Sequence, residues 1–328
     1  MLAVWYERNG AAAEVLQSGE LETPTPAPGE VRVRLAASGV NPIDVKRRRG
    51  ARGQVITDPL VVPGFDGAGV IDAVGDGVAA SRIGERVWVY EGQWQRPRGT
   101  AAEFVTVPAE RAVALPDATS FVEGACLGIP ALTAYHAVAV NGGVRGKSVL
   151  VTGGAGAVGH YAIQFAKLGG AKRVIATVSN RAKGEIATAA GADAVVNYKS
   201  EDVGQRCQAL TDGHGVDRII EVDLAANIQP DLAALRADSE IVVYGTGAPE
   251  IAVPFFPSVL KNVRYQFFIV YNLNAADRAT ALTEVSRLLK ENKLRHQIAK
   301  RLPLAQTAEA HQLVESGQAV GNVVLDIA

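Results

Sequence analysis

Five short runs of β-branched residues recur from about residue 147 onward, and they constrain the fold more than any other feature of this sequence. The runs are SVLVTGG, RVIATVS, DAVVNY, VDRIIEV and EIVVYG. Stretches with helical character separate them, such as AVGHYAIQFAKLGG and RAKGEIATAAGA. Strands that alternate with helices indicate βαβ units and a parallel sheet buried on both faces. The pattern predicts an α/β domain with a doubly wound parallel sheet.

The first third of the chain has a different pattern. In GEVRVRLAA, Val31, Val33 and Leu35 alternate with Arg32 and Arg34, which is the period of a strand with one buried face. Turn-forming stretches such as TPTPAPGE separate this run from similar ones. We therefore expect a compact, mostly antiparallel β unit here. The final run, GNVVLDIA, predicts a strand that rejoins this first unit.

A glycine-rich loop follows the first run of the α/β region. Gly154 to Gly159 read G-x-G-x-x-G, between the apolar residues Val149–Val151 and a helical pattern. A strand–loop–helix of this kind directs backbone N–H groups and the positive end of the helix dipole at one point. We predict that Gly154, Ala155, Gly156, Ala157, Val158 and Gly159 bind the pyrophosphate of a dinucleotide.

The end of the second strand indicates which dinucleotide is bound. NAD sites usually place Asp or Glu about 20 residues beyond the loop, where it accepts hydrogen bonds from the ribose. This chain has Ser179 at that point, followed by Asn180, Arg181 and Lys183. A hydroxyl group and two cations would hold the 2′-phosphate that distinguishes NADP from NAD. We therefore predict NADPH as the cofactor.

Composition excludes several other classes of protein. The formal net charge of −1 gives no global attraction for nucleic acid or an anionic membrane, so we expect neither partner. Neither a signal peptide nor a membrane-spanning helix is expected. Cys126 and Cys207 are the two cysteines and form no CxxC pair, which excludes a disulfide scaffold and a zinc site of several thiolates. We expect a cytoplasmic location.

The chain resembles the medium-chain dehydrogenase/reductase superfamily over essentially its whole length, and within it the zinc-independent quinone oxidoreductases. The motifs that carry this resemblance are GVNPIDVKRRRG, VPGFDGAGVIDAVGDGV, GERVWVY, GIPALTAYHAV, VTGGAGAVGHYAIQFAKLGGAKRVIATVS, GADAVVNY and KNVRYQFFIVYNL. The resemblance implies a GroES-like β-rich catalytic domain, residues 1–123 and 270–328, and a Rossmann NADPH-binding domain, residues 124–269. It also implies a homodimer.

In zinc-dependent relatives, metal ligands occur at three places within these motifs. They carry a Cys near Asn41, a His-Glu pair after Gly64, and a Cys or Asp near Pro130. This sequence has Asn41, then Phe65 and Asp66, and then GIP. Asn and Phe supply neither thiolate nor imidazole, so we expect no catalytic zinc and no other metal.

The absence of zinc affects the expected reaction. Zinc polarises an alcohol or carbonyl oxygen, whereas quinones and activated enones need less help because conjugation stabilises the charge left after hydride arrives. The resemblance implies NADPH-dependent reduction of a quinone or another conjugated carbonyl. Two alternatives remain open: a 2-enoyl or alkenal double-bond reductase, and an NADPH-bound structural or RNA-binding relative with little turnover.

The resemblance also implies roles for individual residues. Asn41 lines the cleft for nicotinamide and substrate, and Thr133 contacts the nicotinamide end. Lys183 and Tyr198 resemble contacts to the 2′-phosphate and the adenosine ribose. Gly245 ends the fifth strand, and Phe268 to Val270 form the sixth strand along the nicotinamide.

The residue at position 46 differs from the one that the family usually has there. Many of these reductases have a Tyr two residues after the motif aspartate, Asp44, and this chain has Lys46 within a run of four cations. Lys46 is a candidate donor to a quinone oxygen, and a solvated basic turn is the alternative. The sequence therefore identifies no catalytic residue, and Asn41 and Lys46 are the candidates in the substrate cleft.

Overall fold

The computed structural model describes residues 1–51 and 56–327. The chain divides into unit 1, Met1–Pro130 with Glu284–Ala328, and unit 2, Ala131–Thr283. The second junction therefore falls within α10 (Ala275–Lys290), after the predicted boundary at residue 270. One reason is that the Arg278 guanidinium, on the first half of α10, donates hydrogen bonds to the carbonyl oxygens of Tyr271 and Leu273.

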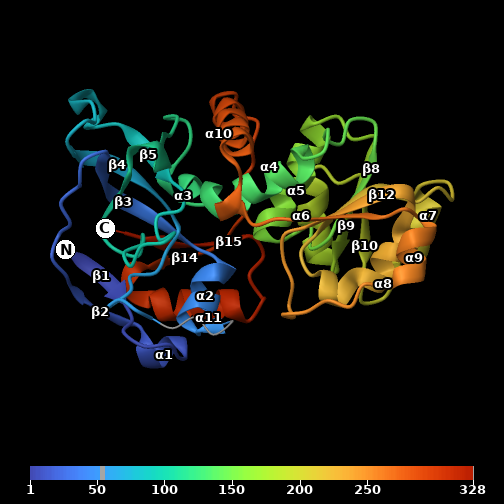
Figure 1. Cartoon of the computed structure of the whole chain (residues 1–328), viewed down its shortest axis with the longest axis horizontal. Coiled ribbons are helices and arrows are strands. Elements are labelled where there is room, and N and C mark those ends of the chain that lie inside the picture. The colour runs from blue at the N-terminus through green and yellow to red at the C-terminus, as the bar shows by residue number, and fades with distance from the viewer. Residues whose placement is uncertain (52–55, 328) are drawn as a thin grey trace. The chain divides into compact units, whose positions relative to one another are not determined.

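Among the described residues, unit 1 is built on a mixed sheet of seven strands. Figure 1 labels β3, β4, β5, β14 and β15 of this sheet. Its order is β14-β15-β3-β4-β5-β7, and β6 also pairs with β3. These strands are β3 (Glu30–Val40), β4 (Asp66–Val74), β5 (Arg86–Val89), β6 (Phe104–Pro108), β7 (Ala112–Ala114), β14 (Ile298–Pro303) and β15 (Asn322–Asp326). The predicted final strand is confirmed, because β15 pairs antiparallel with β3.

The sheet of unit 1 buries the alternating side chains that the sequence indicated. Val31, Val33 and Leu35 on β3 are at most 3% exposed, while Arg32 and Arg34 point away from this core. A separate hairpin and short helices complete the unit: β1 (Leu2–Trp5), β2 (Gln17–Glu20), α1 (Ala12–Val15), α2 (Pro42–Arg48), α3 (Phe121–Gly124) and α11 (Thr307–Glu315). The predicted mostly antiparallel β unit is therefore confirmed.

Unit 2 is a parallel sheet of six strands in its described residues, in the order β10-β9-β8-β11-β12-β13. The strands are β8 (Ser148–Val151), β9 (Arg173–Val178), β10 (Ala194–Asn197), β11 (Val216–Glu221), β12 (Leu235–Val243) and β13 (Arg264–Phe267). The order reverses direction between β8 and β11, and a crevice for a dinucleotide lies at such a switch point in this kind of sheet. The predicted doubly wound fold is confirmed.

Helices cover the sheet of unit 2 (Figure 1). They are α4 (Leu132–Ala139), α5 (Ala157–Leu168), α6 (Arg181–Ala189), α7 (Val203–Leu210), α8 (Leu224–Ala234) and α9 (Phe255–Leu260). Helices α5 and α6 pack against β8, β9 and β10, and α8 packs against β11 and β12. The strands β8, β9 and β11 are almost fully buried, which explains their continuous β-branched sequences.

The predicted sixth strand is displaced along the chain. Strand β13 ends at Phe267, and Val270 begins a short 3₁₀ turn, Val270–Asn272. We had assigned Phe268 to Val270 to this strand, because periodicity does not mark where a strand ends within an apolar run. Phe268 still donates its backbone N–H to Val243 O, so the chain leaves the sheet directly after it.

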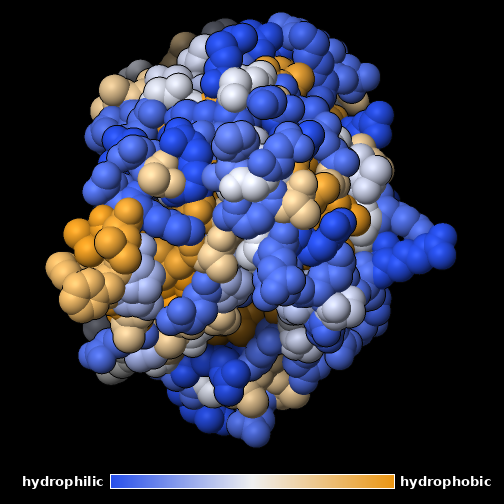
Figure 2. Space-filling view, turned by 90° about the vertical axis from the view of Figure 1, so that its right-hand side faces the viewer, coloured by the Kyte–Doolittle hydropathy of each residue, from blue (hydrophilic) through white to orange (hydrophobic). Residues whose placement is uncertain are grey.

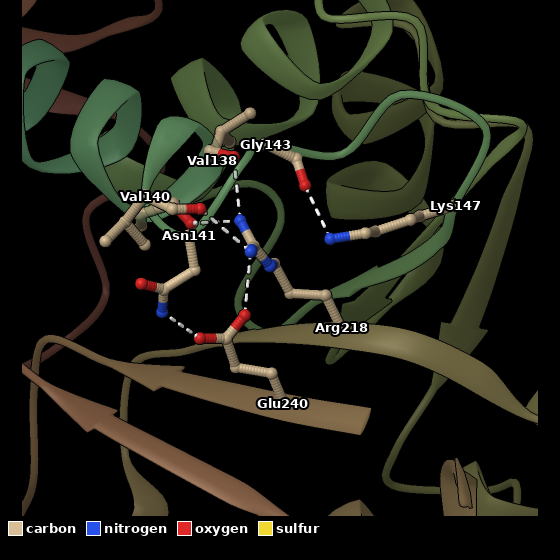
Figure 3. A network of polar contacts seen from close by, with 8 residues as sticks. Val138, Val140, Asn141, Gly143, Lys147, Arg218 and Glu240 are labelled. Carbon is tan, nitrogen blue, oxygen red and sulfur yellow. Dashed lines mark hydrogen bonds and ion pairs between the residues drawn. The ribbon is translucent and has the colours of Figure 1, made fainter. Parts of the chain in front are cut away.

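A buried ion pair fixes the end of α4 to the sheet of unit 2 (Figure 3). The Arg218 guanidinium on β11 lies 2.7 Å from the Glu240 carboxylate on β12. It also donates to Val138 O at 2.8 Å and to Val140 O at 2.9 Å, at the C-terminal end of α4. Asn141 donates its side-chain amide to the other oxygen of Glu240. Arg218 thus satisfies helix-end carbonyl groups that have no partner within the helix.

Replacing Arg218 by Met should destabilise the fold by about 3–5 kcal/mol, because Glu240 would remain buried without a cation. The double variant R218M/E240L should lose less than R218M, since it removes both charges. Urea unfolding followed by fluorescence measures both. The matched control is R287M, which breaks the exposed pair of Arg287 and Glu284 and should change the unfolding midpoint little. A midpoint for R218M equal to that of R287M would contradict the role of the buried pair.

Candidate functional site

The glycine-rich loop leads from β8 into α5 at the switch point of the sheet. Gly153 has a backbone φ of +65°, a left-handed conformation that glycine adopts without strain. Gly153 lies directly before Gly154, the first glycine of the motif. Gly154 is needed for packing, because a Cβ there would lie 2.7 Å from the Ala176 Cβ on β9.

The other two glycines of the motif lie as a dinucleotide site requires. Gly156 is the residue before α5, and the nearest atom to a Cβ built on it is Gly153 O at 3.2 Å. That distance is a tight contact for a side chain, so glycine suits this position. A Cβ on Gly159 would lie 2.3 Å from Gly153 O, so only glycine allows α5 to approach the loop this closely. No side chain caps the N-terminus of α5, so the backbone N–H groups of its first turn can stabilise an anion.

Helix α6 begins with the residues predicted to select NADPH. Asn180 caps this helix by accepting a hydrogen bond from the Lys183 backbone N–H at 2.9 Å. Ser179 is half-buried and lies between β9 and this cap. No carboxylate occurs from Ser179 to Lys183, so nothing in this segment would repel a 2′-phosphate.

The two predicted cations of this segment differ in their surroundings. The Arg181 side chain is 94% exposed and forms an ion pair with Glu185 at 3.1 Å. Lys183 is half-buried, and among the described residues its ammonium group has no ion-pair partner. Tyr198 follows β10 and is 52% exposed. Lys183 is therefore the better placed of the two cations to meet a phosphate.

A groove of about 690 Å³ lies along α6 and β10. Its lining includes Asn180 and Arg181 from the predicted cofactor site, and also Glu185 and Glu201. The two glutamates make this groove a poor continuation of a phosphate site, because they place negative charge beside it.

In unit 1, three chain segments meet at the carboxyl group of Asp66, the first residue of β4. Asp66 Oδ2 accepts a hydrogen bond from Asn41 Nδ2 at 2.9 Å and another from Ile129 N at 2.9 Å. These are the three places where zinc-dependent relatives carry their ligands. Hydrogen bonds on one carboxyl group therefore link segments that a metal links in those relatives. An Asp at the start of an apolar strand was the sequence signal for Asp66, and we had assigned it no role.

Burial changes the acidity of two carboxyl groups in this region. Asp44 accepts hydrogen bonds from the backbone N–H groups of Asn41 and Gly64, and burial nevertheless raises its pKa to about 7. Burial also raises the pKa of Asp66 well above its ordinary value. Asp66 Oδ1 has no hydrogen-bond partner among the described residues, and a Cβ on Gly128 would lie 2.1 Å from it. Gly128 thus leaves space for this oxygen.

The remaining predicted cofactor residues lie near His136 and the carboxyl end of β12. Thr133 is buried on α4, one helical turn before His136. The His136 and Phe268 rings are 4.6 Å apart, and burial lowers the pKa of His136. Val270 is buried two residues further on. Position 245 requires glycine, because the backbone there passes close to Val222 and a Cβ would lie 2.2 Å from Val222 O.

Most of the cationic side chains from Lys46 to Arg49 form hydrogen bonds or ion pairs within unit 1. Arg48 is fully buried and donates to Gly10 O and to Glu315 on α11. Arg49 also pairs with Glu315, and Arg47 donates to Gln93 O. Lys46 is exposed on α2. The run therefore holds α2 to its neighbours, which leaves little of it to form a nucleic-acid surface.

Two absences apply to residues 1–51 and 56–327. No group of three or more His, Cys, Asp or Glu side chains lies where it could hold a metal ion. No helix is both long enough and apolar enough to cross a membrane.

Comparison with known families matches both halves of the chain. A family described as "Alcohol dehydrogenase GroES-like domain" matches residues 27–117. A family described as "Zinc-binding dehydrogenase" matches residues 157–287. These matches agree with the β-rich unit and the parallel-sheet unit.

Relatives and solved structures extend the similarity over the whole chain. A 2-haloacrylate reductase from Burkholderia sp is 30% identical over 99% of this chain and 98% of its own length. The human quinone oxidoreductase is 28% identical over 98% of this chain and 95% of its own length. The structure of an NAD-dependent alcohol dehydrogenase has a TM-score of 0.90 at 32% identity, covering all of both chains. A mycobacterial protein solved with NADPH has a TM-score of 0.88 at 29% identity, covering 99% of this chain and 100% of its own.

The fold, the glycine loop and these similarities together define the class of protein. The chain belongs to the medium-chain dehydrogenase/reductase superfamily. Within it, the chain belongs to the branch of zinc-independent quinone oxidoreductases.

Removing the acceptor at Asp66 should destabilise unit 1. Asp66→Ala leaves the Asn41 amide and the Ile129 N–H buried without a partner, at a cost of about 2–5 kcal/mol. Asp66→Asn should cost less, because its amide oxygen can accept both hydrogen bonds while its NH₂ group occupies the position of Oδ1. Urea unfolding of the two variants beside the wild type measures the difference. Equal losses for both variants would contradict the role of Asp66 as the shared acceptor.

Proposed function

We propose that this chain is an NADPH-dependent oxidoreductase that transfers hydride to a quinone without zinc. The observation that carries the proposal is the set of hydrogen bonds on Asp66. These bonds join the three segments in which zinc-dependent relatives carry their metal ligands. Relatives named quinone oxidoreductase support the substrate class. Without a metal to polarise a carbonyl oxygen, a conjugated acceptor is the chemically suitable substrate.

The proposed NADPH site uses residues of unit 2 that the sequence indicated. Gly154 to Gly159 would hold the pyrophosphate, and Ser179, Asn180, Arg181, Lys183 and Tyr198 the adenosine half. Thr133, Gly245, Phe268 and Val270 would lie along the nicotinamide, which supplies the hydride when NADPH is bound. The first turn of α5, which no side chain caps, fits this use. A structural neighbour solved with NADPH supports the choice of cofactor.

Asn41 and Lys46 are the candidates for contacts with the substrate. The Asn41 amide is held by Asp66, so it has a defined orientation. Lys46 is exposed and would donate to a quinone oxygen. We assign neither residue a proton-transfer step.

A second candidate function is reduction of an activated carbon–carbon double bond. The observation that favours it is the similarity to a 2-haloacrylate reductase over nearly the full length of both chains. The same hydride donor serves either substrate, because both accept hydride at a conjugated carbon. The third alternative, an RNA-binding relative, is disfavoured because Arg47, Arg48 and Arg49 bond within unit 1.

The test of the proposed reaction follows NADPH oxidation at fixed enzyme with 1,2- and 1,4-quinones, a 2-haloacrylate, an alkenal and an enoyl thioester. Turnover greatest with a quinone supports the proposal. Turnover with the haloacrylate or the alkenal but with no quinone would replace it by the double-bond reductase. No turnover with any acceptor would favour a binding protein.

Replacing Lys183 by Ala should weaken NADPH binding by about 1–3 kcal/mol and leave NADH binding nearly unchanged, because the lost hydrogen bond is to the 2′-phosphate. Arg181→Ala should have a smaller effect, since Glu185 already occupies that guanidinium. Glu185→Gln should strengthen NADPH binding by freeing Arg181. Dissociation constants for both dinucleotides measure these changes. An equal loss of NADPH and NADH affinity in K183A would contradict the assignment of Lys183.

We propose in addition that two copies of the chain associate along β13, the last strand of the sheet in unit 2. Its outer edge has no paired strand among the described residues. Large apolar side chains lie on β13 and on the neighbouring α9: Phe267, Phe255, Phe256 and Leu260 are 54%, 69%, 72% and 79% exposed. Figure 2 shows hydrophobic side chains gathered on one side of the face that it draws. An exposed edge strand beside an apolar surface suits pairing with a second copy.

The homodimer predicts a molar mass in solution twice that of the chain, measured by light scattering. Phe255→Glu with Phe256→Glu should yield monomers, because charge on this surface opposes its burial. A monomeric wild type would contradict the proposal. We also propose a reducing, cytoplasmic setting, which the two buried free cysteines support and cell fractionation would test.

A further inference from the structure

Two carboxyl groups are buried together in unit 2, away from any cation. Glu221 is the last residue of β11 and Asp231 lies on α8, and their residues are 0% and 1% exposed. Asn227, one helical turn before Asp231 on α8, donates to Glu221 Oε1 at 2.9 Å, which places Asp231 on the helix face toward Glu221. Glu221 Oε2 and Asp231 Oδ2 are both buried and have no hydrogen-bond donor among the described residues. The two carboxyl groups interact with each other. In the described part of the chain, no Lys, Arg or His pairs with either residue.

A hydrogen bond between two carboxyl groups requires a proton. Two ionised carboxylates have no hydrogen to share, and they repel each other strongly in a buried place. Burial raises the pKa of both groups, and the charge of Glu221 raises the pKa of Asp231 further. The pair therefore retains a proton to a higher pH than two separate, exposed carboxyl groups would.

The groups around the pair supply no compensating positive charge. Cys207 on α7 faces Asp231, and burial raises its pKa to about 12. Tyr244 after β12 faces Glu221, and burial raises its pKa above the ordinary value. Both are neutral at pH 7. Asp223 lies two residues from Glu221 and is an acid, and Thr152 and Asn227 complete the surroundings as uncharged groups.

The pair lies directly under the switch point of the sheet. Glu221 Oε1 accepts hydrogen bonds from the Asp223 backbone N–H and from Asn227 Nδ2. The Thr152 hydroxyl, just before the glycine loop, accepts from Val222 N at 3.0 Å. Asp223 Oδ1 accepts from Gly247 N at 2.8 Å. The segment Val222–Asp223 thus connects the glycine loop with the carboxyl end of β12, and Glu221 anchors it.

We propose that Glu221 and Asp231 share one proton, and that this shared hydrogen bond positions the segment Val222–Asp223 at the dinucleotide crevice. The inference rests on the proposed dinucleotide site. Both residues are buried and act through the segment Val222–Asp223, so both are positioning residues. Loss of the proton as the pH rises turns the hydrogen bond into a repulsion between two anions, and the anchored segment then loses its support.

The direction of the pH effect follows from linkage. The folded chain holds the shared proton more tightly than the unfolded chain, where each carboxyl group has its ordinary pKa. The contribution of the pair to stability is therefore complete in acid and is lost as the pH rises through the raised pKa of the folded pair. Affinity for NADPH should fall over the same alkaline range.

The experiment measures the dissociation constant of NADPH, by fluorescence, between about pH 6 and pH 10, with thermal unfolding over the same range. In Asp231→Asn the amide supplies a permanent N–H donor to Glu221, so the alkaline loss of affinity seen in the wild type should be absent. Asp231→Ala removes the bond and should weaken NADPH about tenfold near pH 7, the effect expected for one buried hydrogen bond. The control is Asp212→Asn, on an exposed turn, which should retain the wild-type profile.

The outcomes separate this inference from the proposed function. An alkaline loss of NADPH affinity in D231N equal to that of the wild type would overturn the shared proton, and so would wild-type affinity in D231A. If the wild type binds no NADPH, the proposed function fails. The thermal arm then decides the inference alone, since D231N should lose less thermal stability on going to alkaline pH than the wild type. That comparison uses only the conservative variant, so it holds even if D231A does not fold.

Discussion

The close approach of α5 to the end of β8 is the contact on which the arrangement of unit 2 depends. A Cβ on Gly159 would lie 2.3 Å from Gly153 O, and one on Gly154 would lie 2.7 Å from the Ala176 Cβ. The helix can start where it does only because these side chains are missing. The same requirement places the uncapped first turn of α5 at the switch point between β8 and β11. Fold and anion site therefore share one set of glycines.

Unit 1 shows how a site of this family is held together when it has no ligands for zinc. Asp66 collects hydrogen bonds from Asn41 and Ile129, and burial keeps its pKa high. A hydrogen-bonded carboxyl group defines the positions of these segments, but it does not polarise a substrate as a Lewis acid does. This difference limits the chemistry to acceptors that need little activation, which is why the geometry and the proposed quinone substrate agree.

Much of this architecture could be predicted from the sequence, because it follows from local periodicity. The β-branched runs predicted the parallel sheet, and the alternation around Val33 predicted a half-buried strand. The strand end near Phe268 was misplaced, since an apolar run has the same appearance inside a sheet and just beyond it. The glycine motif begins at Gly154, whereas the left-handed backbone lies at Gly153, directly before it.

The features that could not be predicted depend on contacts between distant parts of the chain. Nothing near Asp231 in the sequence indicates that it meets Glu221. Arg181 and Lys183 look equivalent in the sequence, and only the position of Glu185 on the helix separates them. The role of Asp66 required knowledge of which N–H groups lie within reach. In each case the deciding factor is a polar group that must find a partner when buried.

The ion pair of Arg218 and Glu240 has a consequence for how the sequence can change over time. Arg218 serves two helix-end carbonyl groups as well as Glu240, so loss of either charge alone leaves the other buried and uncompensated. A single substitution at either position meets strong selection, whereas a paired change to apolar residues meets much less. Among homologues of this chain, positions 218 and 240 should therefore change together, even though each lies in the interior of a different strand.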